Sequence, residues 1–374
     1  MANTDNNNKS DITVELRSQL SELCKTYLKD GWTTVNENSL VIKPITDGFI
    51  NKLYLCCLPD TCREPGVRKV IVRFEDYEEF KDMGRSQINA ITINIILAAN
   101  NISPKVLGVF PSGTIIEYIE NRYLSQSDYT NTNIIELLAQ KLAKIHSLNI
   151  PIAKDSKTFT NVFRSFLDAD ENMKQSLKDG YIRQVINDLK LNVFQEMDFT
   201  DEFHWLLDVI DHLQSPVVFA HNDFNRRNTL ICESKDNNNN DLNVYLIDFD
   251  WSSYGKRGVD FGQYFNCWGQ EATDFGTGPF PSDQQMLPFI DAYIVEMSKL
   301  VGDDYPKLTV NSRERLLKEA KVCTLMAQIK DILYCIWDSN RNKTTELMVK
   351  GNTKLGDYLK LKAKLLTEFS NDLK

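Results

Sequence analysis

The sequence predicts an α+β protein with two lobes, a small β-rich lobe followed by a larger, mainly helical lobe. Three observations support this prediction. The chain has 374 residues, which exceeds the size at which one hydrophobic core usually stops growing. Short strand patterns dominate before about residue 120, and apolar residues at helical spacing dominate after it. Hydrophobic residues make up 42% of the sequence, which is close to the globular average and enough for packed cores.

The first lobe is expected over residues 13–120, after a polar, Asn-rich segment over residues 1–12 that is predicted to be disordered. Its elements follow from periodicity, with alternation for strands and apolar residues three or four apart for helices. We predict helices over 14–30 and 86–99, strands over 39–44, 52–58 and 69–74, and a hairpin of strands 105–110 and 113–119.

The second lobe is expected over residues 121–374 and is predicted to be mostly helical. Two short strands interrupt the helical pattern and flank a loop with four consecutive Asn residues, which is typical of a solvated tip. We predict helices over 133–148, 158–176, 182–188, 201–213, 283–300, 312–337 and 355–369, and strands over 229–232 and 243–247.

The bulk composition excludes several classes of function. A net charge of -9 repels nucleic-acid phosphates and anionic lipid, so neither nucleic acid nor a membrane surface is expected as a partner. The eight cysteines form no C-x-x-C pair, which favours free thiols in a reducing, cytoplasmic compartment. The first residues carry no apolar signal-peptide region, and no apolar run is long enough to insert into a bilayer.

The strongest candidate for chemistry is the segment AHNDFNRRN over residues 220–228. It places Asp223 two residues after His221 and five residues before Asn228, which is the spacing of the kinase catalytic loop. Asp223 could hold and deprotonate an attacking hydroxyl, and the amide oxygen of Asn228 could bind Mg²⁺. This spacing also occurs by chance, and a solvated Asp in a loop is the alternative interpretation.

A second motif follows at the position that such a loop requires. The predicted strand over 243–247 ends in Asp248, twenty residues after Asn228. Kinases place their second metal ligand at a strand exit of this kind, and a carboxylate oxygen suits Mg²⁺. Two motifs in the right order and separation favour a magnesium-dependent kinase over a chance match.

The same segments and their continuation resemble the choline/ethanolamine kinase family. The chain has HNDFNRRN, then LIDFDWSSY over 246–254 and RGVDFG over 257–262, where the family has HND followed by N, IDFEY-SSY and RGFDIG. Aminoglycoside phosphotransferases share the first motif but not its continuation. Further similar stretches are KLAKIH over 141–146 and GVFPSG over 108–113, and the resemblance covers roughly residues 40–360.

The resemblance implies a bilobal, protein-kinase-like fold, ATP and Mg²⁺ as cofactors, and a role for each matching residue. Asp223 matches the catalytic aspartate, and Asn228 and Asp248 match the metal ligands. His221 matches the residue that braces the catalytic loop, with a purely structural histidine as the alternative, and Asp260 is expected to hold the loop end through backbone N–H groups. For the nucleotide, the matching residues are Arg73, Gly48, Asn51 and the segment from Glu117 to Ile119, which meets adenine through its backbone.

The small lobe departs from the family pattern in two places. Asp47 and Ile50 replace a glycine and a hydroxyl residue beside Gly48 and Asn51, so the phosphate loop is weakened. The acidic helix residue that should orient Arg73 falls at Ala90. We expect Glu75, Glu78 or Glu79 to take over that role, or else ATP affinity or rate to suffer.

The acceptor site also departs from the family. Choline kinases bind the quaternary ammonium in an aromatic cage with an acidic residue nearby. By resemblance the acceptor site contains Trp251, Tyr334 and Trp337, together with Asp250 and Cys267, which stands where the family has an acid. A further cage tyrosine falls at Lys350. The cage is therefore partly kept and less negative than in its relatives.

The expected function is ATP-dependent phosphorylation of the hydroxyl of choline or ethanolamine, the first step of phosphatidylcholine or phosphatidylethanolamine synthesis. The expected partner is a small amino-alcohol, and the resemblance implies a homodimer. Two alternatives stay open. The acceptor is another small amino-alcohol or metabolite, or the protein is a pseudokinase that binds partners, as Ala90, Asp47 and Ile50 would suggest.

Overall fold

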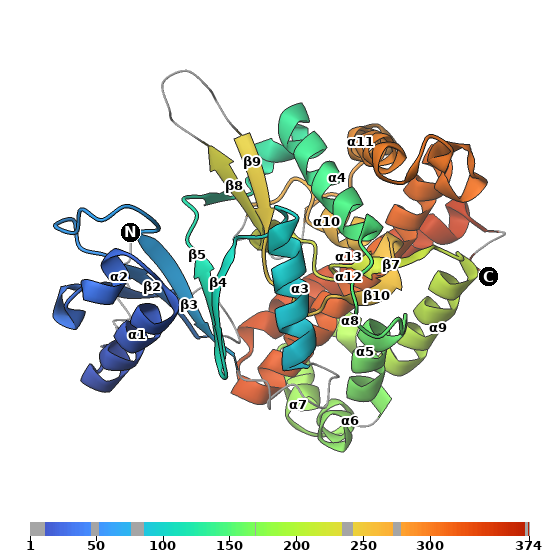
Figure 1. The fold of residues 1–374 in the computed structure, drawn as a ribbon. Coiled ribbons are helices and arrows are strands. Elements are labelled where there is room, and N and C mark those ends of the chain that lie inside the picture. Colours follow the sequence, from blue (N-terminus) through green and yellow to red (C-terminus); the bar gives the residue numbers. More distant parts are fainter. Residues whose placement is uncertain are drawn as a thin grey trace. The chain divides into compact units, whose positions relative to one another are not determined.

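The computed structural model of the protein describes residues 12–45, 52–75, 86–168, 170–233, 242–271, 278–370 and 373. The chain divides into two compact units, residues 1–120 and 121–374, shown as ribbons in Figure 1. Among the described residues, no helix combines the length and the apolar character that crossing a bilayer requires.

Unit 1 is built on a five-stranded antiparallel sheet with the strand order β1-β2-β3-β5-β4. The predicted strands and the closing hairpin are confirmed, with ends that differ by a few residues. In β3, Val70 and Val72 are buried on one face, and Arg73 therefore points to the other face. The strands are β1 (Val41–Ile45), β2 (Lys52–Cys57), β3 (Lys69–Phe74), β4 (Val106–Phe110) and β5 (Gly113–Glu117).

The helices of unit 1 are α1 (Val14–Tyr27), α2 (Gly31–Thr34) and α3 (Gln87–Ala99), with a short 3₁₀ turn over Glu37–Ser39. The helix predicted over 14–30 ends early, because Leu28 is extended and Asp30 adopts a φ of 58°. Side chains from α1, α2 and the sheet form one hydrophobic core, whose members include Leu20, Cys24, Trp32, Cys56, Val70, Val72 and Ile115.

Unit 2 consists mainly of helices. The helix predicted over 158–176 is two helices, because Asp170 starts the second one by accepting a hydrogen bond from the backbone N–H of Met173 at 3.0 Å. The helices are α4 (Thr132–Ser147), α5 (Thr158–Asp168), α6 (Glu171–Lys178), α7 (Tyr181–Asp188), α8 (Asn192–Gln195), α9 (Phe199–His212), α10 (Gly258–Asn266), α11 (Asp283–Val301), α12 (Arg313–Asn342) and α13 (Glu346–Glu368), with 3₁₀ turns η3 (Gln126–Thr130), η4 (Arg226–Asn228), η5 (Tyr305–Lys307) and η6 (Thr309–Asn311).

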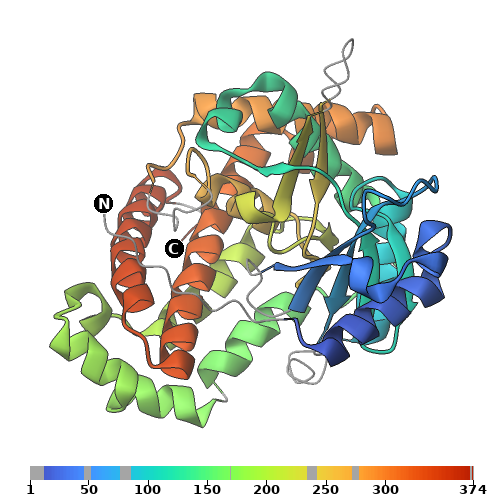
Figure 2. The ribbon, with the colours of Figure 1, turned by 90° about the vertical axis from the view of Figure 1, so that its left-hand side faces the viewer.

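Helix α12 is the centre of unit 2 and packs against α10 and α13. Figure 2 shows α12 and α13 side by side as the two red helices. Gly262 allows α10 to approach α12 closely, because a Cβ at this position would lie 2.3 Å from the backbone oxygen of Cys323. Both helices contact the candidate catalytic segment, residues 221–228, through Asp260 on α10 and Lys330 on α12.

Two small sheets flank the candidate catalytic segment, residues 221–228, within unit 2. Strand β7 (Val217–Ala220) pairs with β10 (Ser253–Lys256), and β8 (Thr229–Glu233) pairs with β9 (Leu242–Leu246) (Figure 1). Strand β8 also pairs with β6 (Arg122–Tyr123). Strands β8 and β9 were predicted from the sequence, whereas β7, β10 and α10 were not. Residues 221–228 therefore run from the end of β7 to the start of β8.

Candidate active site

The segment after β7 is held by the carboxylate of Asp260 on α10. This carboxylate accepts hydrogen bonds from the backbone N–H of His221 at 2.8 Å and of Asn222 at 2.7 Å. Asn222 has a φ of 62°, so the chain turns sharply immediately before Asp223. Asp260 is fully buried, and the expectation that it holds the loop end through backbone N–H groups is confirmed.

A buried histidine connects Asp260 to the rest of the core. The Nε2 of His146 lies 3.1 Å from Asp260, and its Nδ1 lies 2.8 Å from the hydroxyl of Tyr293. Burial lowers the pKa of His146 and outweighs the charge of Asp260, so the imidazole is neutral. A neutral ring fits one arrangement, in which Nε2–H donates to Asp260 and Nδ1 accepts from Tyr293.

The side chain of His221 faces the protein interior and contacts the segment after β9. Its side chain is fully buried, its Nε2 lies 3.1 Å from the backbone oxygen of Ile247, and its ring packs on Phe249 at 4.6 Å between centroids. These contacts join the segment after β7 to the segment after β9. They are the contacts of a bracing residue, because they fix the position of Asp223 relative to Asp248.

Asp223 and Asn228 lie side by side. The Nδ2 of Asn228 donates to Oδ2 of Asp223 at 2.7 Å and to its backbone oxygen at 3.0 Å. The backbone N–H of Asn225 donates to the same backbone oxygen at 2.8 Å. A carboxylate only accepts, so the amide of Asn228 must turn its nitrogen to Asp223, and its oxygen points elsewhere.

The other oxygen of Asp223 is paired with a residue that the sequence reasoning missed. Lys330, in the middle of α12, donates to Oδ1 of Asp223. Burial raises the pKa of Asp223, but the ammonium of Lys330 outweighs it and the net shift is downward. Burial lowers the pKa of Lys330, and the charge of Asp223 reverses that shift. Both groups are therefore charged at neutral pH.

The spacing of α12 gives the only sequence signal for Lys330. It lies four residues before Tyr334 and seven before Trp337, so all three share one face of the helix. A cation on the face that carries the predicted cage aromatics points to the same site. The sequence alone could not show that this face meets a loop 107 residues away.

Asp248 follows β9 in a conformation that turns it out of the strand. Its φ is 62°, and the backbone N–H of the preceding Ile247 donates to the backbone oxygen of Asn228 at 3.0 Å. This bond continues the β8–β9 pairing and brings Asp248 next to Asn228. The two predicted metal ligands therefore lie at the same end of the antiparallel pair, Asn228 just before β8 and Asp248 just after β9.

The residues present fit a magnesium ion. Asn228 offers an amide oxygen and Asp248 a carboxylate, which are hard ligands of the kind that Mg²⁺ prefers. Within the described ranges, no group of three or more His, Cys, Asp or Glu side chains could hold a metal. A site with one carboxylate and one amide suits an ion that keeps water and substrate phosphate as its other ligands.

The predicted acceptor aromatics are all half-buried and have ring partners. Trp251 stacks on Phe163 at 6.1 Å and 18°, and its backbone oxygen accepts from the side chain of Asn222 at 2.9 Å. Tyr334 and Trp337 contact each other at 6.0 Å. The guanidinium of Arg341 lies over the Trp337 ring at 5.2 Å.

The remaining acceptor candidates differ in position. Cys267 is buried at the end of α10, close enough to affect the pKa of Lys330. Asp250 is half-buried in the turn after Asp248. Lys350 is exposed on α13 and pairs with Glu346 at 2.9 Å, so its ammonium has a surface partner.

In unit 1, Arg73 and Glu75 form an ion pair with 3.1 Å between Nε and Oε1. They are two residues apart at the end of β3 and so share a face. Glu75 thus supplies the acidic partner that Ala90 on α3 lacks, as the sequence suggested. Gly48 and Asn51, with Asp47 and Ile50, lie outside the described residues.

The segment assigned to adenine forms the end of β5 and the residues after it. The backbone N–H of Glu117 donates to the backbone oxygen of Lys105 at 2.9 Å, and that of Tyr118 to Lys69 at 3.3 Å. Ile119 follows directly, after the strand has ended. These bonds fix the course of the backbone through which adenine contacts are expected.

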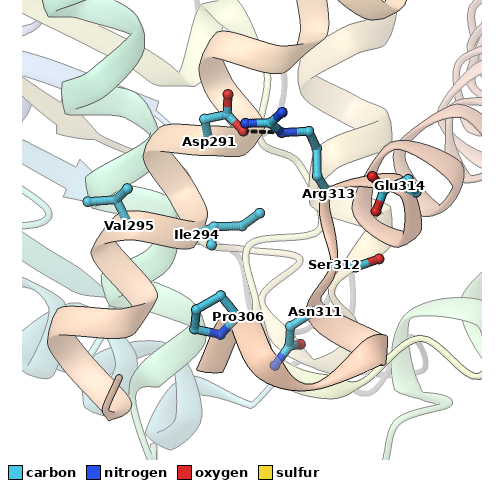
Figure 3. A pocket seen from close by; sticks show the side chains of 8 residues that line it. All are labelled: Asp291, Ile294, Val295, Pro306, Asn311, Ser312, Arg313 and Glu314. Atoms are coloured by element: carbon cyan, nitrogen blue, oxygen red, sulfur yellow. Dashed lines mark hydrogen bonds and ion pairs between the residues drawn. The ribbon is translucent and has the colours of Figure 1, made fainter. Parts of the chain in front are cut away.

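A cavity of about 440 Å³ opens elsewhere in unit 2 (Figure 3). Figure 3 shows Arg313 and Asp291 joined across its lining. The Nε of Arg313 lies 2.7 Å from Oδ1 of Asp291. The cavity lining contains none of the predicted site residues; it consists of Asp291, Ile294, Val295, Pro306, Asn311, Ser312, Arg313 and Glu314.

Comparison with known proteins places this constellation in a family. Residues 42–358 match the family model described as choline/ethanolamine kinase. The chain belongs to the choline/ethanolamine kinase family. This membership confirms the resemblance and makes the protein a phosphotransferase with an alcohol group as acceptor.

Individual choline/ethanolamine kinases are similar over most of their length. The chain is 27% identical over 300 residues to the choline/ethanolamine kinase of Rattus norvegicus, covering 78% of this chain and 72% of that protein. It is 28% identical over 299 residues to choline kinase alpha of Mus musculus, covering 72% and 64%.

Solved structures confirm the predicted kinase-like α+β fold. A choline kinase from Cryptosporidium parvum has a TM-score of 0.65 at 19% identity and covers 94% of this chain and 96% of its own. A Plasmodium vivax ethanolamine kinase has a TM-score of 0.60 at 19% identity, covering 96% and 92%. An ADP-bound aminoglycoside phosphotransferase has a TM-score of 0.51 at 15% identity, covering 94% and 98%.

Proposed function

We propose that the protein transfers the γ-phosphoryl group of ATP to the hydroxyl of choline or ethanolamine. The observation that carries the proposal is the cluster of Asp223, Asn228 and Asp248, held by Asp260 and His221 within a chain of this family. The pseudokinase alternative is not favoured, because a protein without catalysis has no chemical need to keep all three residues in place.

Asp223 is proposed to position the acceptor. Its carboxylate accepts a hydrogen bond from the acceptor hydroxyl and takes the proton as the new O–P bond forms and the bond between the γ-phosphorus and the bridging oxygen of ADP breaks. The pKa of Asp223 lies below its ordinary value, so Asp223 is anionic and a weak base. A weak base suits a loose transition state, in which positioning and charge neutralisation supply most of the catalysis.

Asn228 and Asp248 are proposed to hold Mg²⁺ on the ATP phosphates. When bound, the ion neutralises charge on the transferring phosphoryl group. Arg73, oriented by Glu75, is proposed to contact the phosphates as well. The backbone from Glu117 to Ile119 is proposed to contact adenine, and Gly48 and Asn51 remain candidates for the phosphate loop.

The amine of the acceptor is proposed to lie against the aromatic rings of Trp251, Tyr334 and Trp337. Aromatic faces attract ammonium groups, by roughly 0.5–2 kcal/mol each depending on desolvation. Asp250 and Cys267 are proposed to complete this part of the site. We also propose a cytoplasmic location, which the pattern of free cysteines supports, and a homodimer, which rests on the family resemblance.

An acceptor panel tests the proposal. The initial rate of ADP formation is measured with Mg²⁺ and ATP against choline, ethanolamine, serinol, glycerol and an aminoglycoside. We expect the highest kcat/KM for choline or ethanolamine, and an increase in KM with little change in kcat for Trp337→Ala. A higher kcat/KM for glycerol or the aminoglycoside would refute the proposed acceptor, and ADP formation that no acceptor stimulates would refute the kinase.

A further inference from the structure

The ion pair of Lys330 and Asp223 places a permanent cation where the acceptor hydroxyl is proposed to bind. Lys330 is not at the surface, since only 14% of its side chain is exposed. It holds Oδ1 of Asp223, whereas Asn228 holds Oδ2. An acceptor hydroxyl that reaches this carboxylate therefore arrives next to an ammonium.

The carboxylate of Asp331, the residue after Lys330, is itself neutralised by a lysine. Asp331, which follows Lys330 on α12, pairs with the buried Lys354 at 2.6 Å and accepts from the side chain of Asn266 at 3.0 Å. In the described part of the chain, Asp223 and Asp331 are thus each matched by one lysine. The thiol of Cys267 lies near Lys330.

The aromatic part of the site continues from Lys330 along the same face of α12. Tyr334 and Trp337 follow one and two helical turns later, and Arg341 lies over the Trp337 ring. The face that would receive an acceptor amine therefore has a lysine at one end and an arginine at the other, with the carboxylate of Asp338 near Tyr334. Choline and ethanolamine carry their nitrogen only two carbons from the hydroxyl, so the amine cannot move far from Lys330.

We propose that Lys330 is a specificity-determining residue, whose ammonium reduces the preference of the acceptor site for cationic over neutral alcohols. The proposal rests on the proposed function for the position of the acceptor hydroxyl. It adds a role that differs from simple positioning of Asp223. A residue that only positioned Asp223 through a hydrogen bond would affect cationic and neutral acceptors alike.

Lys330→Met tests this role by comparing choline with 3,3-dimethyl-1-butanol, its neutral isostere. We expect the KM for choline to fall at least tenfold, which corresponds to about 1.4 kcal/mol. The KM for the isostere should change by less than about threefold. The kcat should fall with both alcohols, because Asp223 loses a positioning contact. Lys330→Arg should keep the wild-type ratio of the two KM values.

Two further variants control for charge and folding. Lys299→Met removes an exposed lysine that pairs with Glu296 on α11 and should leave both KM values unchanged. Lys330→Gln is neutral and keeps a hydrogen-bond donor for Asp223. It should reproduce the choline effect of Lys330→Met, and it replaces that variant if Lys330→Met does not fold.

A titration with choline, in which tryptophan fluorescence reports binding, tests this proposal independently of the proposed function. If the wild type phosphorylates neither choline nor ethanolamine, the proposed function fails, and the fluorescence titration still decides the role of Lys330. Tighter choline binding by the neutral variants with unchanged binding of the isostere supports the proposal. Equal changes for both ligands, or weaker or undetectable choline binding by the neutral variants, would overturn it.

Discussion

Asn228 donates its side-chain N–H to the carboxylate of Asp223 over 2.7 Å. This one bond assigns both atoms of the amide, because the nitrogen faces the carboxylate and the oxygen is therefore turned away from it. The same side chain thus positions the candidate base and is also the proposed metal ligand. A kinase needs this coupling, since the nucleophile and the magnesium-bound phosphates must meet in line.

The metal assignment predicts different effects for the two ligands. Asp248→Ala should lower the rate on the order of 10²-fold or more, because a carboxylate ligand and its charge are lost. Asn228→Ala should mainly raise the Mg²⁺ concentration needed for half-maximal rate. Initial rates as a function of Mg²⁺ concentration provide the measurement. Wild-type metal dependence in both folded variants would remove these residues from the site.

Asp260 should matter for stability as well as rate. Asp260→Asn keeps the shape but turns an N–H₂ group toward the backbone N–H of His221 or Asn222. Leaving buried donors unpaired should lower the free energy of unfolding by about 2–5 kcal/mol, measured by urea titration. The matched control is Asp291→Asn, whose exposed pair with Arg313 should contribute less than about 1 kcal/mol. Equal stability of the two variants would contradict the role of Asp260.

The two buried histidines predict that stability falls in mild acid. Burial lowers the pKa of His146 and of His221 below the ordinary value of 6.5. The unfolded chain therefore binds more protons than the folded chain once the pH falls below 6.5. Their contribution to stability is fully present above pH 6.5 and is lost as the pH falls toward the folded-state pKa values.

Urea unfolding at pH 7.5, 6.5 and 5.5 measures this loss. Each histidine contributes a slope that approaches about 1.4 kcal/mol per pH unit. His146→Gln should reduce the slope, whereas His212→Gln should not, since His212 is exposed. A free energy of unfolding that stays constant between pH 7.5 and 5.5 would show that the buried histidines are not held neutral.

Cys267 offers a second way to change the charge beside the acceptor. Cys267→Glu would place a carboxylate near Lys330, and we expect the choline KM to fall about three- to tenfold as this charge offsets the ammonium. Cys267→Gln has the same size without the charge and serves as control. If the glutamate variant is folded and active but its KM equals that of the glutamine variant, Cys267 does not face the acceptor.

The part of the site that lies close together in the sequence was predictable. His221, Asp223 and Asn228 share one short segment, and the strand before Asp248 is local to it, so the two motifs together predicted that these residues lie close to one another. Glu75 was also within reach of sequence reasoning, because alternate residues of a strand share a face. The sequence offered Glu75 only as one of three candidates for the partner of Arg73, with Glu78 and Glu79, and the structure shows the pair with Glu75.

The long-range contacts were not predictable. Lys330 meets Asp223 through tertiary packing that brings α12 to the segment after β7, a contact that no local pattern in the sequence encodes. The prediction of one helix over 158–176 was wrong for a local reason, because Asp170 caps the start of a second helix. Strands β7 and β10 have four residues each, too few for a clear alternation.

The transfer of label from [γ-³²P]ATP to choline and ethanolamine tests the central claim most directly. Wild-type protein and Asp223→Asn are compared in parallel, with Mg²⁺ present and with both variants verified as folded. We predict labelled phosphocholine or phosphoethanolamine with the wild type, and a rate about 10²–10⁴-fold lower with Asp223→Asn. Absence of label in both amino-alcohols with the wild type, or a folded Asp223→Asn variant with near wild-type transfer, would contradict the account.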